Sequence, residues 1–231
     1  MEQFSRTEML IGKEKLDILK SKTVLIFGIG GVGSYIVESL ARCGIGTLIL
    51  VDNDVVSLSN INRQIIALHS TVGKAKVDVM KERILDINPN ANVICYQEFV
   101  SPENIDKFID KKIDYIVDAI DTVKSKIAII EKTKELDIPI ISSMGTGNKL
   151  DPLKFKITDI SKTSVCPLAK VIRKELKEKG IKKVKVLYSE EVPNKATTKT
   201  SECKVVPASI AFVPSVAGLA ISGEVVRDLI K

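Results

Sequence analysis

A strand, a glycine-rich turn and a helix near the amino terminus limit what this chain can fold into more than any other feature. Residues 23–29 form a short apolar run rich in β-branched side chains, which predicts a buried parallel strand. The run Gly28-Ile29-Gly30-Gly31-Val32-Gly33 follows, and residues 32–43 have the pattern of a helix. Here Gly28 permits a tight turn, Gly30 lets backbone approach a phosphate, and Gly33 lets the helix pack on the strand. The free N–H groups and positive dipole end of the helix then favour a bound anion.

A carboxylate stands where a nucleotide site needs one. Residues 48–51 predict a second strand, and Asp52 ends it about 20 residues after the first glycine, the position from which an acidic side chain reaches a ribose hydroxyl. A glycine-rich turn alone is weak evidence, because many such turns hold no ligand. The strand, the helix and the acidic residue together indicate nucleotide binding.

Further polar residues follow that a plain redox cofactor site does not need. Asp54 completes a DxD with Asp52. A short loop follows that carries a hydroxyl, two amides and a cation, on Ser59, Asn60, Asn62 and Arg63. A fixed cation beside a phosphate cradle stabilises charge that develops on phosphates during a reaction. The pattern therefore favours a site that breaks a phosphoanhydride over one that only holds it.

The rest of the first 150 residues alternates between strands and helices. We expect helices over 72–87, 101–109 and 122–136, and strands over 92–96, 113–119 and 138–142. In the second of these helices Ser101 should be the cap and Pro102 the first residue.

This alternation predicts an α/β fold with a doubly wound, mostly parallel sheet of the Rossmann type, which binds ligands at the carboxyl ends of its strands. Asp52, Asp118, Asp121 and Ser143 fall at or just after such ends.

The chain changes character after residue 150, so we divide it into a core over 1–150 and a basic extension over 151–231 that is continuous with the core. The extension predicts strands over 155–159 and 184–188, a basic helix over 167–179, a loop over 190–204 and a helix over 215–230 that packs back on the sheet. Residues 151–204 hold 14 Lys/Arg against 7 Asp/Glu, a net of +7, while the whole chain is +6. Such a face is either a solvated surface or a binding surface for nucleic acid, with Lys182, Lys183 and Lys185 as candidate contacts.

Composition is that of a compact soluble enzyme, 45% hydrophobic and 28% charged. No apolar run approaches the roughly 20 residues of a membrane span, and residues 1–22 have no signal-peptide core, so we expect a cytoplasmic protein. The four cysteines are scattered and none forms CxxC, which speaks against a zinc knuckle or a disulfide framework.

Several motifs together resemble the ThiF/MoeB/HesA superfamily of adenylating enzymes, which are related to ubiquitin-activating enzymes. The resemblance runs from about residue 4 to residue 143. Besides the glycine turn, its motifs are Asp52-Asn53-Asp54, Ser59-Asn60-Ile61-Asn62-Arg63-Gln64, Val72-Gly73-Lys74-Ala75-Lys76 and Asp118-Ala119-Ile120-Asp121.

One branch of this superfamily, the tRNA threonylcarbamoyladenosine dehydratases, is similar over nearly the whole chain. Its additional motifs are Ile87-Asn88-Pro89, Asp151-Pro152, Thr158-Asp159-Ile160 and Cys166-Pro167-Leu168-Ala169. The resemblance implies an ATP-dependent enzyme that adenylates the threonyl carboxylate of threonylcarbamoyladenosine in tRNA. Attack from within the same side chain then closes a ring, with net loss of water. It also implies ATP and Mg²⁺ as cofactors, modified tRNA as partner, and proteins of a sulfur-transfer system as further candidate partners.

The resemblance also suggests roles for individual residues. Arg63 and Lys76 are similar to the family's phosphate-binding, catalytic pair, and Asp121 to its catalytic magnesium carboxylate. The expected nucleotide contacts are Gly28, Gly30, Gly31, Gly33, Asp52, Asp54 and Asn60. Arg6 is similar to an N-terminal arginine that reaches the γ-phosphate in the neighbouring subunit, which implies a homodimer.

Two other functions remain open. An activator of a ubiquitin-like sulfur-carrier protein, of the ThiF or MoeB type, would share the ATP site but act on a protein C-terminus. In a Rossmann dinucleotide-binding protein, Arg63, Lys76 and Asp121 would have no functional role. The basic segment favours tRNA, although charge indicates affinity for polyanions and says nothing about chemistry.

Some of these residues, and others nearby, also have purely structural interpretations. Asp118 can cap a strand end, Arg63 can form a surface ion pair, and Lys74 can be a solvated lysine on the same helix as Lys76. The single histidine, His69, and the four cysteines can be structural as well. A catalytic cysteine for transthiolation is the alternative for Cys203 and, less so, for Cys166. The other two cysteines are Cys43 and Cys95.

Overall fold

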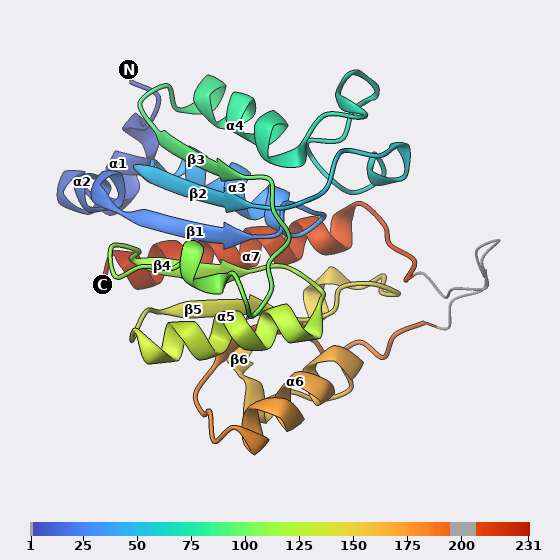
Figure 1. Ribbon diagram of the computed structural model, residues 1–231. Helices are drawn as coiled ribbons and strands as arrows, with labels where there is room; N and C mark the ends of the chain where they lie inside the picture. Colours follow the sequence, from blue (N-terminus) through green and yellow to red (C-terminus); the bar gives the residue numbers. More distant parts are fainter. Residues whose placement is uncertain (1, 195–206) are drawn as a thin grey trace.

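Seven strands form one sheet in the order β3-β2-β1-β4-β5-β7-β6 (Figure 1). The structure is a computed structural model that describes residues 2–194 and 207–231. All neighbouring strands are parallel except β6 and β7. The strands are β1 (Thr23–Phe27), β2 (Thr47–Val51), β3 (Asn92–Tyr96), β4 (Tyr115–Asp118), β5 (Ile140–Ser143), β6 (Phe155–Asp159) and β7 (Lys185–Ser189). The expected doubly wound, mostly parallel α/β fold is confirmed.

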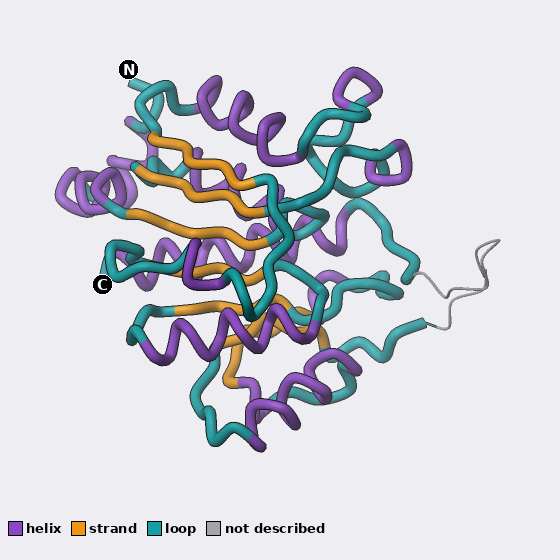
Figure 2. The backbone as a smooth tube through the Cα atoms, viewed as in Figure 1, coloured by secondary structure: helices purple, strands orange, loops and turns teal. Residues whose placement is uncertain are grey.

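Helices cover both faces of the sheet (Figures 1 and 2). The α-helices are α1 (Ser5–Ile11), α2 (Lys13–Ser21), α3 (Gly33–Arg42), α4 (Lys76–Ile87), α5 (Val123–Glu135), α6 (Pro167–Glu178) and α7 (Phe212–Leu229). Short 3₁₀ turns are η1 (Leu58–Asn60), η2 (His69–Thr71), η3 (Ile105–Lys107), η4 (Pro152–Lys154) and η5 (Ile160–Lys162). Successive strand side chains point to opposite faces, so Val24 and Ile26 pack with α3, α4 and α7, while Leu25 and Phe27 pack with α5 and α6.

The basic extension adds to the same sheet. β7 pairs with β5, β6 pairs with β7, and α7 returns to pack on α3. The two helices approach closely, since a Cβ on Gly218 would lie 2.5 Å from the carbonyl oxygen of Val32. The expected packing of the C-terminal helix on the sheet is confirmed. The helix starts at Phe212, ahead of the expected residue 215, because Pro214 is tolerated in a first turn. The functional division at residue 150 stays a prediction.

Two expected helices differ from the structure. The helix expected over 72–87 begins only at Lys76, because residues 72–74 form a turn and a bend, and Ala75 bridges to Val55. Lys74 is therefore not on the helix of Lys76. Between 101 and 109 only η3 forms, and Ser101 is no cap.

The reason for the missing helix is local. The side chain of Asn104 accepts a hydrogen bond from the backbone N–H of Ser101 and donates one to the carbonyl oxygen of Phe99. Asparagine side chains compete in this way with the backbone bonds that a helix needs.

The order of strands decides where a ligand can bind. The chain winds from β1 through β2 to β3 on one side and then crosses over to β4 on the other, so β1 and β4 are neighbours at the switch point. A crevice opens outside the carboxyl ends of two such strands. Within the part of the chain that the structure describes, no helix is both long and apolar enough to span a bilayer.

Candidate active site

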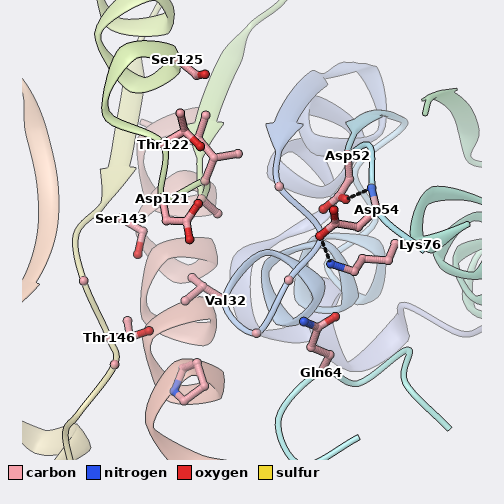
Figure 3. Close-up of a pocket in the computed structure, with 18 of the residues that line it drawn as sticks. Val32, Asp52, Asp54, Gln64, Lys76, Asp121, Thr122, Ser125, Ser143 and Thr146 are labelled. Carbon is pink, nitrogen blue, oxygen red and sulfur yellow. Dashed lines mark hydrogen bonds and ion pairs between the residues drawn. The ribbon is translucent and has the colours of Figure 1, made fainter. Parts of the chain in front are cut away.

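A cavity of about 750 Å³ lies at this switch point, beyond the carboxyl ends of the parallel strands (Figure 3). One wall carries Asp52, Asp54 and Lys76, and the opposite wall carries Asp121 and Thr146. The residues expected at the site that line it are Gly28, Gly30, Gly31, Asp52, Asp54, Asn60, Arg63, Lys76 and Asp121. Motifs that lie far apart in the sequence therefore meet in one space of the size that a nucleotide needs.

The glycine turn has the geometry that its sequence predicts. Gly28 has a φ of 89°, a left-handed conformation that other residues rarely adopt. A Cβ on Gly33 would lie 1.7 Å from the carbonyl oxygen of Gly28, so only glycine lets α3 start so close to β1. Gly33 does not line the cavity; it supports the turn that does.

Asp52 ties the DxD segment to the glycine turn. Its Oδ2 accepts a hydrogen bond from the backbone N–H of Ile29 at 2.6 Å, and its Oδ1 accepts one from that of Asp54 at 2.8 Å. The carboxylate is thereby held in one orientation at the cavity edge. Each oxygen keeps a free lone pair that a ribose hydroxyl can use.

The two expected cations differ in their surroundings. The Nζ of Lys76 lies 2.7 Å from Oδ2 of Asp54, and the lysine side chain is 5% exposed while the aspartate is 57% exposed. Arg63 donates from one guanidinium nitrogen to the carbonyl oxygen of Ser59 and to Oδ1 of Asn62, both at 2.9 Å. Within residues 2–194 and 207–231, Arg63 has no carboxylate partner, so its charge is available to an anion in the cavity.

Gln64 supports the interpretation as a nucleotide site. Its Oε1 is buried and has no hydrogen-bond partner among the described residues. The side chain reaches the cavity beside Gly30, where an added Cβ would meet only the Gln64 amide, at 3.9 Å (Figure 3). An unpaired buried acceptor is costly, so a ligand that donates a hydrogen bond there would relieve it.

Asp121 is the expected magnesium carboxylate. It is exposed to the cavity from the turn after β4. The described residues contain no group of three or more side chains that could hold a metal ion by themselves. Mg²⁺ is commonly bound by one or two carboxylates together with the phosphates of the substrate, so the role of Asp121 stays a prediction.

A buried ion pair supports the turn that carries Asp121. Asp118 and Lys126 are fully buried, with Lys126 Nζ 2.8 Å from Asp118 Oδ2. The hydroxyl of Ser142 donates to the same oxygen at 2.6 Å, and Asp118 Oδ1 accepts from the backbone N–H of Ile120 at 3.3 Å. Asp118 therefore does more than cap the end of a strand: its buried hydrogen bonds and ion pair hold the turn in place.

The remaining expected residues lie elsewhere. Arg6 is exposed on α1, which lies at the amino ends of the strands, away from the cavity of its own chain (Figure 1). His69 is exposed in η2, and Cys203 lies outside the described residues. Cys166 is buried, whereas Cys43 and Cys95 are only partly buried, and burial raises the pKa of both of these thiols. None of the three described cysteines is placed as an active thiolate.

Sequence reasoning missed part of the wall that carries Asp121. It consists of Gly145, Thr146 and Gly147 after β5, with Pro207 and Ser209 beside them. Two asparagines connect this wall: Asn148, with a φ of 59°, exchanges hydrogen bonds with Ala208, and Asn62 donates to the carbonyl oxygen of Ser209 at 3.0 Å. The Gly-Thr-Gly run directly after an apolar strand was a signal that could have identified part of it.

The fold and this cavity define a nucleotide-binding α/β protein. The model of the ThiF family matches residues 4–231, so the chain belongs to the ThiF family. The tRNA threonylcarbamoyladenosine dehydratase of Bacillus subtilis is 49% identical, over all of this chain and 96% of that protein. The enzyme of the same name from Escherichia coli is 41% identical over 76% of this chain and 66% of its own length. The crystal structure of that E. coli enzyme, TcdA, in complex with ATP superposes with a TM-score of 0.91 at 33% identity, covering 99% of this chain and 93% of that one.

Proposed function

We propose that this chain is an ATP-dependent tRNA threonylcarbamoyladenosine dehydratase. The observation that carries the proposal is the single cavity that joins the glycine turn, Arg63, Lys76 and Asp121 at the switch point of the sheet. Full-length similarity to a named dehydratase, and to a structure that holds ATP, supports the choice among the activities that such a cavity could serve.

The proposed reaction has two steps. An oxygen of the threonyl carboxylate attacks the α-phosphorus of ATP, and pyrophosphate leaves. A nucleophile of the same modified side chain then attacks the activated carbonyl carbon, closes a ring and releases AMP. The carboxylate oxygen that departs with AMP, together with the protons lost from the side chain, accounts for the net loss of one water.

The cavity residues divide this work. The N–H groups at the start of α3 and the cations Arg63 and Lys76 stabilise negative charge that builds up on the phosphates. Asp121 would hold Mg²⁺, which neutralises part of that charge. Asp52 would orient the ribose, and Asn60 and Asp54 would complete the nucleotide contacts.

A homodimer is part of the proposal. Arg6 can serve a phosphate site only in a neighbouring chain, because α1 lies away from the cavity of its own chain. On the same helix Met9 and Leu10 are 74% and 86% exposed, and a partner that covered them would remove apolar surface from water.

ATP should bind with Mg²⁺ more tightly than NAD does. Arg63 and Lys76 would contact the additional phosphate of a triphosphate, which a dinucleotide lacks. Calorimetric titration of the same protein with both ligands measures the difference. Tighter binding of NAD than of ATP would overturn the assignment of the cavity.

The proposed function itself is tested with modified tRNA. Incubation with ATP, Mg²⁺ and tRNA bearing threonylcarbamoyladenosine should give nucleosides that are lighter by one water in mass spectrometry, together with AMP. A reaction without ATP is the control. If no dehydrated nucleoside forms and AMP formation depends instead on a ubiquitin-like carrier protein, the chain is a sulfur-carrier activator.

A further inference from the structure

A second cavity of about 460 Å³ lies beside α6, apart from the catalytic cavity. The buried side chains of Ile160 and Leu176, with the half-buried Ile181, give it an apolar floor. Its rim carries four cations and one carboxylate, namely Arg173, Lys177, Lys182, Lys183 and Asp159. An apolar space of this size with a strongly cationic rim fits a ligand that is flat, apolar on its faces and anionic at its edge.

The cations of this rim are available to a ligand. Lys177, Lys182 and Lys183 have no ion-pair partner among residues 2–194 and 207–231. Arg173 donates to the carbonyl oxygen and the hydroxyl of Thr163 at 2.8 and 2.6 Å, which fixes its guanidinium without neutralising it.

Much of the other positive charge of the extension is already used. Lys185 is bound to Glu224 and Asp228 on α7, so its charge is already paired, and its contact with tRNA stays a prediction. Lys156 and Lys179 likewise pair with Glu190 and Glu131. Among the described residues of 151–194, six cations have no ion-pair partner, and four of them line the second cavity.

The turn that presents two of these lysines is held in an uncommon conformation. Lys183 has a φ of 58°, in the left-handed region that few residues other than glycine adopt. The Nζ of Lys134, on α5, donates to its carbonyl oxygen at 2.9 Å. Local backbone strain of this kind persists where the surrounding structure enforces it, often at binding sites.

Helix α6 connects the two cavities. Leu168 near its start lines the catalytic cavity, and Lys177 near its end lines the second, about 14 Å further along at 1.5 Å per residue. Lys170, Arg173 and Lys177 are spaced at intervals of three and four residues, so they lie on one face of the helix. A cationic stripe thus runs along α6 to the second cavity, on the side of the helix away from Leu168.

We propose that the second cavity binds an unstacked nucleoside of the substrate RNA, whose backbone follows the stripe on α6. The inference rests on the proposed function, which supplies the RNA. Sequence-specific RNA recognition uses bases splayed onto apolar or guanidinium surfaces, and lysines bind the flanking phosphates. Arg173, held by Thr163, offers such a planar surface.

Binding of tRNA without chemistry tests the stripe and the rim. The double variant Lys177→Glu/Lys182→Glu should raise the Kd for unmodified tRNA at least about tenfold at low salt and flatten its salt dependence by about one unit per lost phosphate contact. The matched control Lys111→Glu/Lys112→Glu reverses two exposed lysines in the turn before β4 and should leave both quantities nearly unchanged. ATP affinity should be that of the unaltered protein in each. Equal tRNA affinities of the two double variants would overturn the proposal. They would point instead to an acidic protein as the partner of this surface.

A second variant separates the cavity from its charge. Ser161→Trp places an indole in the cavity from an exposed position and changes no charge. It should raise the KM for modified tRNA several-fold while kcat and the salt dependence stay the same. An unchanged KM would overturn the nucleoside site. Dehydration of tRNA by the unaltered protein is scored separately, so failure of the proposed function is recognised independently.

Discussion

Replacing Arg63 or Lys76 by alanine should lower the rate of adenylation by roughly 10²-fold or more while the fold persists. Each variant removes a fixed positive charge from the cavity in which negative charge spreads over the phosphates, and one such group is typically worth a factor of this size. For Lys76 the fold should persist because its partner Asp54 is 57% exposed and stays solvated when the lysine is removed. Pyrophosphate release at saturating ATP and modified tRNA measures the effect.

Two neighbouring residues serve as controls. Lys74→Ala makes the same change two positions earlier, at an exposed residue outside α4, and should leave the rate nearly intact. His69→Ala, in the exposed turn η2, should do the same. Near-normal pyrophosphate release by both Arg63→Ala and Lys76→Ala would contradict the roles proposed for them, and equal losses in Lys74→Ala and Lys76→Ala would point to a general effect of charge.

The parts of this structure that follow from sequence are those set by short-range chemistry. The apolar run of β1 and the glycines after it determine the turn locally, since Gly28 must take a positive φ and Gly33 must lie against it. The ends of parallel strands share one edge of the sheet, so placing Asp52 and Asp121 at strand ends was enough to bring them to one cavity.

The parts that sequence could not supply depend on distant partners or on competing hydrogen bonds. The side chain of Asn104 bonds to the backbone of residues 99 and 101, and these bonds form in place of the helix that Ser101 and Pro102 predict. Lys185 looks like a surface cation in the sequence, yet α7 brings Glu224 and Asp228 to it. Even so, the charge of the extension was informative, because three of its described lysines without an ion pair line one cavity.

The buried pair of Asp118 and Lys126 was also invisible in the sequence, where each looks like an ordinary polar residue. Both side chains have 0% exposure, with Asp118 at the end of β4 and Lys126 on α5. Burial of two charges is tolerated only when they are paired and their remaining polar atoms are satisfied. The hydroxyl of Ser142 and the backbone N–H of Ile120 provide those additional bonds.

Lys126→Met should therefore lower the free energy of unfolding by about 3–5 kcal/mol, because it leaves the Asp118 carboxylate buried without a cation. That is a large part of the stability of a typical domain, roughly 5–15 kcal/mol. Lys124→Met is the matched control: the same change on the same helix, at an exposed lysine, with little expected loss. In Lys126→Met/Asp118→Asn the amide oxygen can still accept from Ser142, and the uncompensated charge is gone, so part of the loss should be recovered. Urea unfolding of the unaltered protein and the three variants gives the loss and its recovery, and equal midpoints for Lys126→Met and Lys124→Met would show that the buried pair contributes nothing to stability.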